Sequence, residues 1–295
     1  MSVESLDLGA IGDTEVVPVD RAGLLRRLMR DRVAAIAALV LATAALGALF
    51  ATWIAPYDPY FTDLNKAMQP PSLDHWFGTD STGRDILSRV MFGTRNTLML
   101  GLVGVVVGGL VGGILGILSA FYRSLDGWIM RLVDVMLAFP AILIGLAMAA
   151  IFGAGLMAVL VALVIATVPE VARVARGAAI GVMSQEFMEA GRAVGVSDGA
   201  LIWRYLTFNC VSTIFVFLTL RFGQIILIGS VLGFLGMGAQ PPTAELGMMA
   251  AQGRDFLFMA PHIATIPSCT IFVIVLAANL LGDAFRDVLD PRLQT

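Results

Sequence analysis

Six long apolar blocks, separated by short polar segments, run along this sequence. A helix that crosses a bilayer needs about 17 to 25 mostly apolar residues, and every block meets that length or lies close to it. The first is too long, and follows too long a tail, for a cleaved signal peptide. The pattern predicts an all-α, polytopic membrane protein with six transmembrane helices, at Val33–Ala55, Thr97–Phe121, Leu132–Phe152, Leu156–Ala172, Val211–Gly238 and Ile263–Leu281.

A polar segment, Gln185–Tyr205, separates the fourth block from the fifth. Before Gly195, small and apolar residues recur at the spacing of one helical face, at Phe187, Ala190, Gly191 and Val194. The charged Glu186, Glu189 and Arg192 lie off that face. After the glycine, Ser197 or Asp198 can cap a second helix. We expect two short helices joined by a glycine turn, an arrangement suited to docking on another protein.

Two further patterns predict helices with special surfaces. Four glycines in the second block recur every four residues, at Gly104, Gly108, Gly112 and Gly116. Such a strip permits close packing of helices, either as a static seam or as a surface on which helices slide.

In Trp76–Arg95, turn residues precede an amphipathic stretch from Arg84 onward. We expect this stretch to lie at the membrane interface before the second span.

Composition excludes several classes of protein. The chain is 58% hydrophobic and 14% charged, with a mean hydropathy of +0.86, unlike a soluble domain. It has no basic patch for nucleic acid, no phosphate-binding GxxxxGK[ST] loop and no catalytic motif. The cysteines and histidines are unclustered, which argues against a metal site and a disulfide: Cys210, Cys269, His75 and His262. If ATP drives this protein, another chain binds it.

The positive residues predict the orientation, because they favour the cytoplasmic side. With the N-terminus inside, thirteen arginines are cytoplasmic: Arg21, Arg26, Arg27, Arg30, Arg32, Arg123, Arg131, Arg173, Arg176, Arg192, Arg204, Arg286 and Arg292. Five positive residues lie outside: Lys66, Arg84, Arg89, Arg95 and Arg254. We therefore expect a multi-pass protein of the bacterial inner membrane, with both termini and the Gln185–Tyr205 segment in the cytoplasm.

Several strings resemble one family. Glu189-Ala190, followed by Gly195, is similar to the EAA loop of ABC importer permeases. The FGTD-x-x-GRD-x-x-SR string of Trp76–Arg95 resembles the C-type permeases of the dipeptide/oligopeptide/nickel importers. So do three others: Met130–Pro140, Leu232–Pro242 and Asn279–Leu293. These strings occur in family order and cover nearly the whole chain from Arg27 onward.

This resemblance implies a MetI-like core of five helices after an extra first span. It also implies a second, B-type permease subunit, two ATPase subunits and an extracytoplasmic solute-binding protein. ATP and Mg would bind the ATPases, and no cofactor would bind this chain. The coupling residues would be Glu186, Phe187, Glu189, Ala190, Gly191, Val194, Gly195, Ser197 and Asp198. A candidate extracytoplasmic gate or docking surface comprises Asp80, Gly83, Arg84 and Asp85.

The chain departs from the family pattern at three positions. Gly191 replaces a usual alanine, Phe208 stands where a proline is common, and Gly229 stands where we expect many relatives to carry a glutamate. If that glutamate meets the amine of a peptide, this chain cannot supply the contact. Di- and oligopeptides are the leading solutes, while nickel chelates, glutathione, opines and sugar conjugates stay open.

Arg221, within the fifth block, is the sharpest pathway candidate. A charge at membrane depth is unfavourable and normally faces a cavity or a partner. One possibility is that Arg221 and the neighbouring Gln224 line the translocation path, where Arg221 would attract an anionic group of the solute. The alternative is that Arg221 snorkels to the membrane surface or pairs with an acid on the partner permease. Glu170, directly after Pro169, is expected to cap or kink the inner end of the fourth span.

The expected organisation has four parts. A cytoplasmic tail, 1–32, precedes a first span with its outer loop and interfacial helix, 33–96. The core, 97–285, contains the coupling loop, and a cytoplasmic tail follows at 286–295. Three other functions compete with the importer. The first is a stand-alone secondary transporter or channel, for which Asp134 is slight support. The second is a membrane-embedded enzyme, although the sequence lacks a convergent catalytic set, and the third is an ABC exporter.

Overall fold

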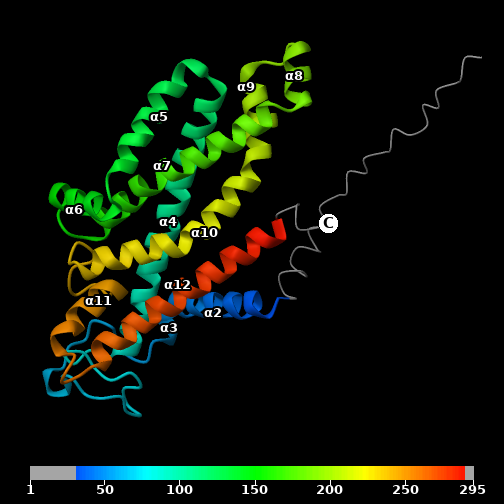
Figure 1. The fold of residues 1–295 in the computed structure, drawn as a ribbon. Coiled ribbons are helices and arrows are strands. Elements are labelled where there is room, and N and C mark those ends of the chain that lie inside the picture. The colour runs from blue at the N-terminus through cyan, green and yellow to red at the C-terminus, as the bar shows by residue number, and fades with distance from the viewer. Residues whose placement is uncertain (1–30, 290–295) are drawn as a thin grey trace, which may run out of the picture.

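The computed structural model describes residues 31–289. The predicted tails, 1–32 and 286–295, therefore fall largely outside the described residues. The α-helices are α2 (Arg32–Leu49), α3 (Ala51–Ile54), α4 (Ile86–Phe121), α5 (Arg123–Ala138), α6 (Ala141–Phe152), α7 (Leu156–Met183), α8 (Glu186–Ala193), α9 (Asp198–Ala200), α10 (Phe208–Phe234), α11 (Leu246–Gly253) and α12 (His262–Leu289) (Figure 1). Short helical turns are η1 (Leu64–Lys66), η2 (Leu201–Thr207), which is a π-helix, and η3 (Arg254–Phe256).

Five helical stretches are long and apolar enough to cross a membrane: α2, α4, α7, the continuous run α9–η2–α10, and α12. A sixth crossing is formed if α5 and α6 are counted as one span, bent by 90°. The bend falls at Phe139-Pro140. Proline lacks the amide hydrogen that would continue the helix, and it disfavours helical geometry in the residue before it. The third expected span is therefore broken where a continuous helix was expected.

The second span differs from its prediction at its outer end. The expected interfacial helix and the expected span are one helix, α4, which runs without a break for 36 residues. Asp85 caps it by accepting a hydrogen bond from the Ser88 amide at 2.8 Å. No proline or positive-φ glycine interrupts the stretch between Ser88 and Thr97, so nothing local ends the first helix before the second begins.

The glycine strip of α4 packs against α7. A Cβ atom at Gly112 would lie 2.5 Å from the carbonyl oxygen of Val168, and one at Gly108 would lie 2.6 Å from Thr167 Cβ. These distances are shorter than van der Waals contact, so only glycine permits this approach. The neighbouring Gly109 faces Leu218 of α10. The strip thus brings α4, α7 and α10 together along the middle of the molecule.

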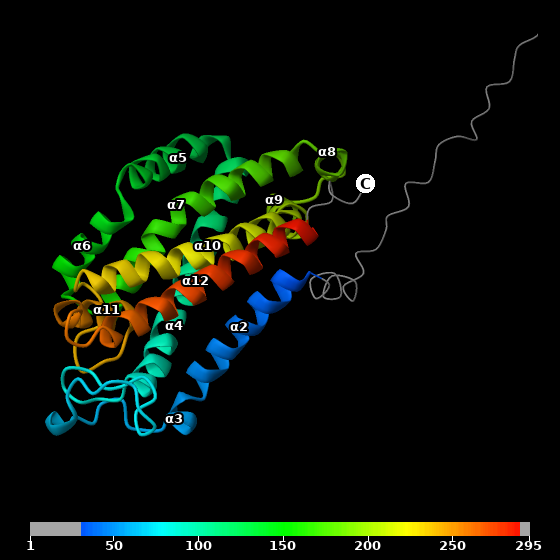
Figure 2. The same cartoon turned by 60° about the horizontal axis from the view of Figure 1, so that its bottom comes forward.

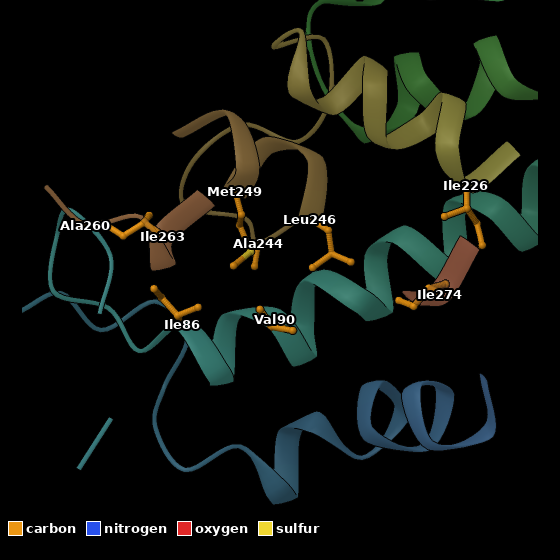
Figure 3. Packing of buried hydrophobic residues seen from close by; sticks show 9 residues of the cluster. All are labelled: Ile86, Val90, Ile226, Ala244, Leu246, Met249, Ala260, Ile263 and Ile274. Atoms are coloured by element: carbon orange, nitrogen blue, oxygen red, sulfur yellow. The ribbon is translucent and has the colours of Figure 1, made fainter. Parts of the chain in front are cut away.

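Three large buried apolar clusters lie along this bundle, and a small fourth one joins Ala34 of α2 to Ala284 of α12. The outer cluster joins α4, α11 and α12 with one residue of α10, and its members are Ile86, Val90, Ile226, Ala244, Leu246, Met249, Ala260, Ile263 and Ile274 (Figure 3). The middle cluster joins α4, α7 and α10: Leu100, Val105, Val159, Ala162, Leu163, Ile225, Leu232 and Met237. The third cluster lies at the α8 end and is called the coupling-end cluster after the coupling loop that the sequence predicts. It comprises Ile117, Ala179, Met188, Leu201, Leu206 and Cys210.

The two described ends of the chain lie at the same end of the molecule as α8. In both views the start of α2 and the end of α12 lie toward α8, while the long loop between α3 and α4 lies at the opposite end (Figures 1 and 2). Helix α2 packs along α12 and the outer part of α4. This arrangement separates the end that carries α8 from the end that carries the loop between α3 and α4, called the loop end below.

Candidate coupling and translocation sites

Helix α8 is built as the sequence predicts. It runs from Glu186 to Ala193 and ends in a left-handed residue, Gly195, with φ of +80°. The amide of Val196 donates to the carbonyl of Gly191, and the amide of Gly195 donates to that of Arg192, both at 3.0 Å. These two bonds form a Schellman motif, which requires a residue with positive φ at this position. Gly195 therefore sets the turn after α8.

Met188 anchors α8 to the membrane bundle. Its side chain is buried within the coupling-end cluster, against residues of α4, α7, η2 and α10. The sequence pattern singled out the face containing Phe187 and Val194, and that face is exposed. Met188 was overlooked because a single apolar residue among charged neighbours gives little periodic signal. The helix is thus fixed from one side and open on the other.

The open side of α8 combines apolar and acidic groups. Phe187 is 41% exposed and Val194 is 84% exposed, while Glu186 and Glu189 lie in the first turn of the helix. Acidic residues favour a helix N-terminus. Arg192 lies over the ring of Phe121, with its guanidinium carbon 5.6 Å from the ring centroid. Exposed large apolar side chains on a charged helix are typical of a surface that another protein covers.

The second half of the coupling loop continues directly into α10. Ser197 occupies the N-cap position of α9, as predicted, but makes no side-chain capping hydrogen bond. Residues Leu201–Thr207 form the π-helix η2, and the ring of Tyr205 stacks on Phe187 at 6.5 Å between centroids. Asp198 lies in the first turn of α9 and is exposed. The second half of the loop and α10 therefore form one continuous helical path from Asp198 to Phe234.

Arg221 pairs with an acid of its own chain. Its Nη1 atom lies 2.7 Å from Glu170 Oε2 and donates to Gln224 Oε1 at 2.5 Å. The Arg221 side chain is 13% exposed and that of Glu170 is 34% exposed. Glu170 lies near the middle of α7, not at its inner end, so the prediction of an end cap is wrong. The partner of Arg221 was missed because the two residues are 51 positions apart.

Two further ion pairs join α5 to α7, and the sequence pattern did not indicate either. Arg176 makes two hydrogen bonds of 2.7 Å to Asp126, whose carboxylate also accepts from Ser119. Arg173 and Asp134 lie 2.7 Å apart and are more than half exposed. Asp134, which offered slight support for a proton relay, is therefore paired with a permanently charged arginine.

The four candidate residues of the outer loop are mostly buried. Asp80 accepts hydrogen bonds from the Arg84 side chain at 2.7 Å and from the Thr82 hydroxyl at 2.8 Å. Burial raises the pKa of Asp80, but the Thr82 hydroxyl, the Arg84 charge and the amides of Thr82 and Arg84 outweigh it, so the pKa lies below its usual value. Asp85 accepts from Ser88, and its carboxylate lies 3.0 Å from His75 Nδ1.

Gly83 completes the turn, since its φ is +79° and any Cβ would overlap the Asp63 carbonyl. These four residues thus hold the loop in shape. The same loop exposes several large side chains, among them Phe61, Leu64, Leu73 and Trp76.

Glu245 is a buried acid that the sequence pattern did not indicate. Its carboxylate caps α11 by accepting from the amides of Gly247 and Met248, both at 2.8 Å. Burial raises the pKa of Glu245, and these amides together with the Thr97 hydroxyl offset only part of that rise. The signal was available, because Glu245 directly precedes the apolar start of a helix in an otherwise uncharged stretch.

Position 229 faces the interior. A Cβ atom on Gly229 would lie 3.3 Å from Leu163 Cδ1 of α7. A glutamate here would therefore point into the middle cluster.

Across residues 31–289, no group of three or more histidine, cysteine or acidic side chains is placed to hold a metal ion. Cys210 is buried and Cys269 is exposed, and both are free.

The sequence and the fold match known transport proteins. Residues 108–295 match the family described as "Binding-protein-dependent transport system inner membrane component". Residues 22–71 match the "N-terminal TM domain of oligopeptide transport permease C". The sequence is 44% identical over 275 residues to proteins named "Glutathione transport system permease protein GsiD" from Escherichia coli O6:K15:H31 and Shigella boydii, covering 91% of this chain and 89% of each relative.

Solved structures of transporters share the fold. The inward-facing MetNI methionine ABC transporter superposes with a TM-score of 0.57 at 19% identity, covering 69% of this chain and 97% of that one. An amino acid ABC transporter crystallised with histidines gives 0.53 at 19% identity, covering 68% and 94%. At this identity the likeness concerns the fold, and it confirms the expected MetI-like core.

Proposed function

The chain belongs to the family of inner membrane components of binding-protein-dependent transport systems, and on that premise we propose how its surfaces divide the work of an ABC importer. It is a permease subunit and not an enzyme. Its family works with ATPases and solute-binding proteins. In our proposal α8 receives the ATPase, the faces of α7 and α10 border the solute path, and the loop before α4 meets the binding protein.

The observation that carries the proposal is the surface of α8. The helix is anchored by Met188 and leaves Phe187 and Val194 exposed beside two acids. Outside the lipid-facing region, such apolar exposure is unfavourable unless a partner covers it. We therefore assign ATPase docking to α8 and the Gly195 turn, with Ser197 and Asp198 at the margin of the surface. ATP and Mg would bind the partner chains and no cofactor would bind this one.

The orientation and assembly follow from this assignment. The described ends of the chain lie at the same end as α8 (Figures 1 and 2), so the proposal puts both termini in the cytoplasm of a bacterial cell, in agreement with the positive residues. The complete complex would contain one B-type permease, two ATPase subunits and one binding protein.

The pathway and the outer docking surface are proposed from exposure and charge. Gln224 and part of Glu170 are exposed at mid-helix positions, where polar groups face protein or water rather than lipid. This favours the α7–α10 face, with Arg221 behind it, as a wall of the path.

At the outer end, Leu73 and Trp76 would offer contact area to the binding protein. The loop that carries them would be kept folded by four residues: Asp80, Gly83, Arg84 and Asp85.

For the solute we propose a small peptide-like molecule, with glutathione and dipeptides as the first candidates. The relatives with 44% identity are named as glutathione transport permeases. Binding of the isolated solute-binding protein to glutathione and to a dipeptide, measured by calorimetry, tests this choice. Binding of neither would redirect the search to the other solutes that the family resemblance leaves open.

The experiment that tests the function is purification of the complex in mild detergent from the native membrane, with partners identified by mass spectrometry. Three forms are compared: wild type, Val194→Asp in the open surface of α8, and Arg123→Gln as an exposed control at the start of α5. We expect a second permease and P-loop ATPases with the wild type and the control, and loss of the ATPases with Val194→Asp. A chain that purifies alone and transports without ATP would indicate a secondary carrier.

A further inference from the structure

Two helices connect the coupling helix to the membrane. Helix α7 ends at Met183, just before α8 begins, and α10 continues without a break from α9 and η2. In both views α7 and α10 run from the α8 end toward the loop end (Figures 1 and 2). The covalent routes from α8 to the rest of the bundle are therefore α7 and α10, and α8 also contacts the end of α4 through Met188 and Arg192.

Apolar packing joins these helices at the ends of the stretch that they share. Near α8 the coupling-end cluster contains Ala179 of α7 and Cys210 of α10. Further out, the middle cluster contains Leu163 of α7 and Ile225 of α10. Between Cys210 and Gly223, α10 has no buried residue within the described structure. Ile214 and Leu218 in this interval reach the glycine strip of α4, and as partly buried residues they also pack on the coupling-end and middle clusters.

The Arg221–Glu170 ion pair bridges this interval. Arg221 lies near the middle of α10 and Glu170 near the middle of α7. The 2.7 Å contact between them is the ion pair that links these two helices within residues 31–289. Gln224, one turn further along α10, accepts a second bond from the same Nη1 atom. The guanidinium is thus held from both helices.

This geometry argues against a free cation that attracts anionic solute. The Arg221 side chain is mostly buried, and Glu170 already neutralises it. An anion from the solute would have to displace a carboxylate of the same chain. A charged pair within the membrane is stable only while both partners remain, so each residue fixes the position of the other.

We propose that the Arg221–Glu170 pair is a brace that makes α7 and α10 move as one body when the ATPases displace α8. The inference rests on the proposed function, because it presupposes a coupled ATPase. Both are positioning residues, since they act through the helices that they join. Without the brace, α10 is free to shift against α7 between the two clusters, and ATP hydrolysis continues with less opening of the path.

The test uses the complete reconstituted complex and needs no knowledge of the solute. A single cysteine reporter, Gln240→Cys, is placed on the exposed outer end after α10, in a background with Cys210→Ala and Cys269→Ala. Maleimide labelling is compared without nucleotide and after trapping with ATP and vanadate, and ATPase rates are measured in parallel. The variants are Glu170→Ala/Arg221→Ala, the reversed pair Glu170→Arg/Arg221→Glu, and the control Arg123→Gln.

The double alanine variant leaves no unpaired charge, so it is expected to assemble. We expect it to keep its ATPase rate but to lose the nucleotide-dependent change in labelling by about five-fold or more, the range of ordinary coupling effects. The reversed pair restores the opposite charges and is expected to recover most of the change. The control is expected to match the wild type.

Two results would overturn the brace. One is a double alanine variant that responds to ATP as the wild type does. The other is a reversed pair that responds no better than the double alanine variant, which would mean that the charge of Arg221 itself acts on solute or on the partner permease. If the wild-type reporter ignores ATP altogether while the complex is assembled, the proposed function fails instead, and the two failures are therefore distinguishable.

Discussion

The carboxylate of Glu245 lies directly against Gly233, so that a Cβ atom on this glycine would overlap Glu245 Oε2. Gly233 belongs to the last turns of α10, and Glu245 caps α11 across the intervening loop. Gly238 in turn packs on the Cα atom of Gly233, because its own Cβ would lie 2.7 Å from that atom. The glycine-rich string at Leu232–Pro242 therefore has a physical reason, namely space for a buried cap.

This relationship predicts a non-additive pair of substitutions. Glu245→Ala removes the cap of α11 and should lower the free energy of unfolding by about 1–2 kcal/mol. Gly233→Ala forces the carboxylate out of place and should cost about 1–3 kcal/mol. In the double variant the new methyl group occupies the space that Glu245 leaves. The loss of stability in the double variant should therefore be smaller than the sum of the two single losses, by a coupling free energy of about 0.5–3 kcal/mol.

The measurement is equilibrium unfolding of the purified chain in detergent, followed by circular dichroism, for the wild type and the three variants. Strictly additive losses would show that Gly233 and Glu245 do not contact each other in solution as they do in this structure.

The glycine strip of α4 offers a second prediction with a control on the same helix. A methyl group at Gly112 would lie 2.5 Å from the Val168 carbonyl oxygen, a backbone atom that cannot move aside. At Gly113 the nearest atom is Ile214 Cδ1 at 3.7 Å, an ordinary contact. Gly112→Ala should therefore destabilise the bundle by about 1–3 kcal/mol, while Gly113→Ala should change stability by no more than about 0.5 kcal/mol.

The thermal midpoint of the assembled complex measures this difference. Equal midpoints for the two alanine variants would mean that α4 and α7 separate in the assembled transporter, as a sliding surface would allow. A lower midpoint for Gly112→Ala alone would favour a static seam.

Helix α8 allows stability and docking to be separated. Met188→Ala removes a buried side chain from the coupling-end cluster and should cost about 2–5 kcal/mol of stability. Phe187→Ala alters the neighbouring, partly exposed side chain and should leave the thermal midpoint nearly unchanged while weakening ATPase retention during purification. If Phe187→Ala destabilises the isolated chain as much as Met188→Ala does, the exposed face has a structural role and ATPase docking must be sought elsewhere.

Sequence reasoning succeeded where a local pattern determines the structure. Apolar block length located the spans, and Gly195 marked the end of α8 because a helix that ends in this way needs a left-handed residue. It failed where distant residues decide. The partner of Arg221 lies on another helix. The bend at Phe139-Pro140 has a local signal in Pro140, which the length of the apolar block outweighed in the prediction. Met188 was missed because burial of a single side chain leaves no periodic trace, whereas Glu245 left a signal as an acid directly before the apolar start of a helix.

The outer loop also shows that residue type alone does not separate docking from folding. Asp80, Arg84 and Asp85 are charged residues in the loop between α3 and α4, and such residues are usually exposed. Their burial results from mutual pairing and from hydrogen bonds to the loop backbone.

The last prediction concerns pH and Asp80. Its folded-state pKa lies below the ordinary value of 3.8, so the ionised form stabilises the folded loop. This contribution is complete above pH 3.8 and is lost as the pH falls through the folded-state pKa. The charged groups around it are Arg84 at 2.7 Å and Arg89 at 3.5 Å. Both stay protonated over this range.

Asp80→Asn should therefore lower the free energy of unfolding by about 1.5–3 kcal/mol at neutral pH, the contribution of a hydrogen bond to a charged group. The difference between wild type and variant should shrink as the pH falls below 3.8. Unfolding midpoints of both proteins from pH 6 to pH 3 measure this difference. Subtracting the variant from the wild type cancels the contributions of the other acids, which the two proteins share. A difference that stays constant with pH would mean that Asp80 acts through its shape and hydrogen bonds, and that its charge does not stabilise the loop.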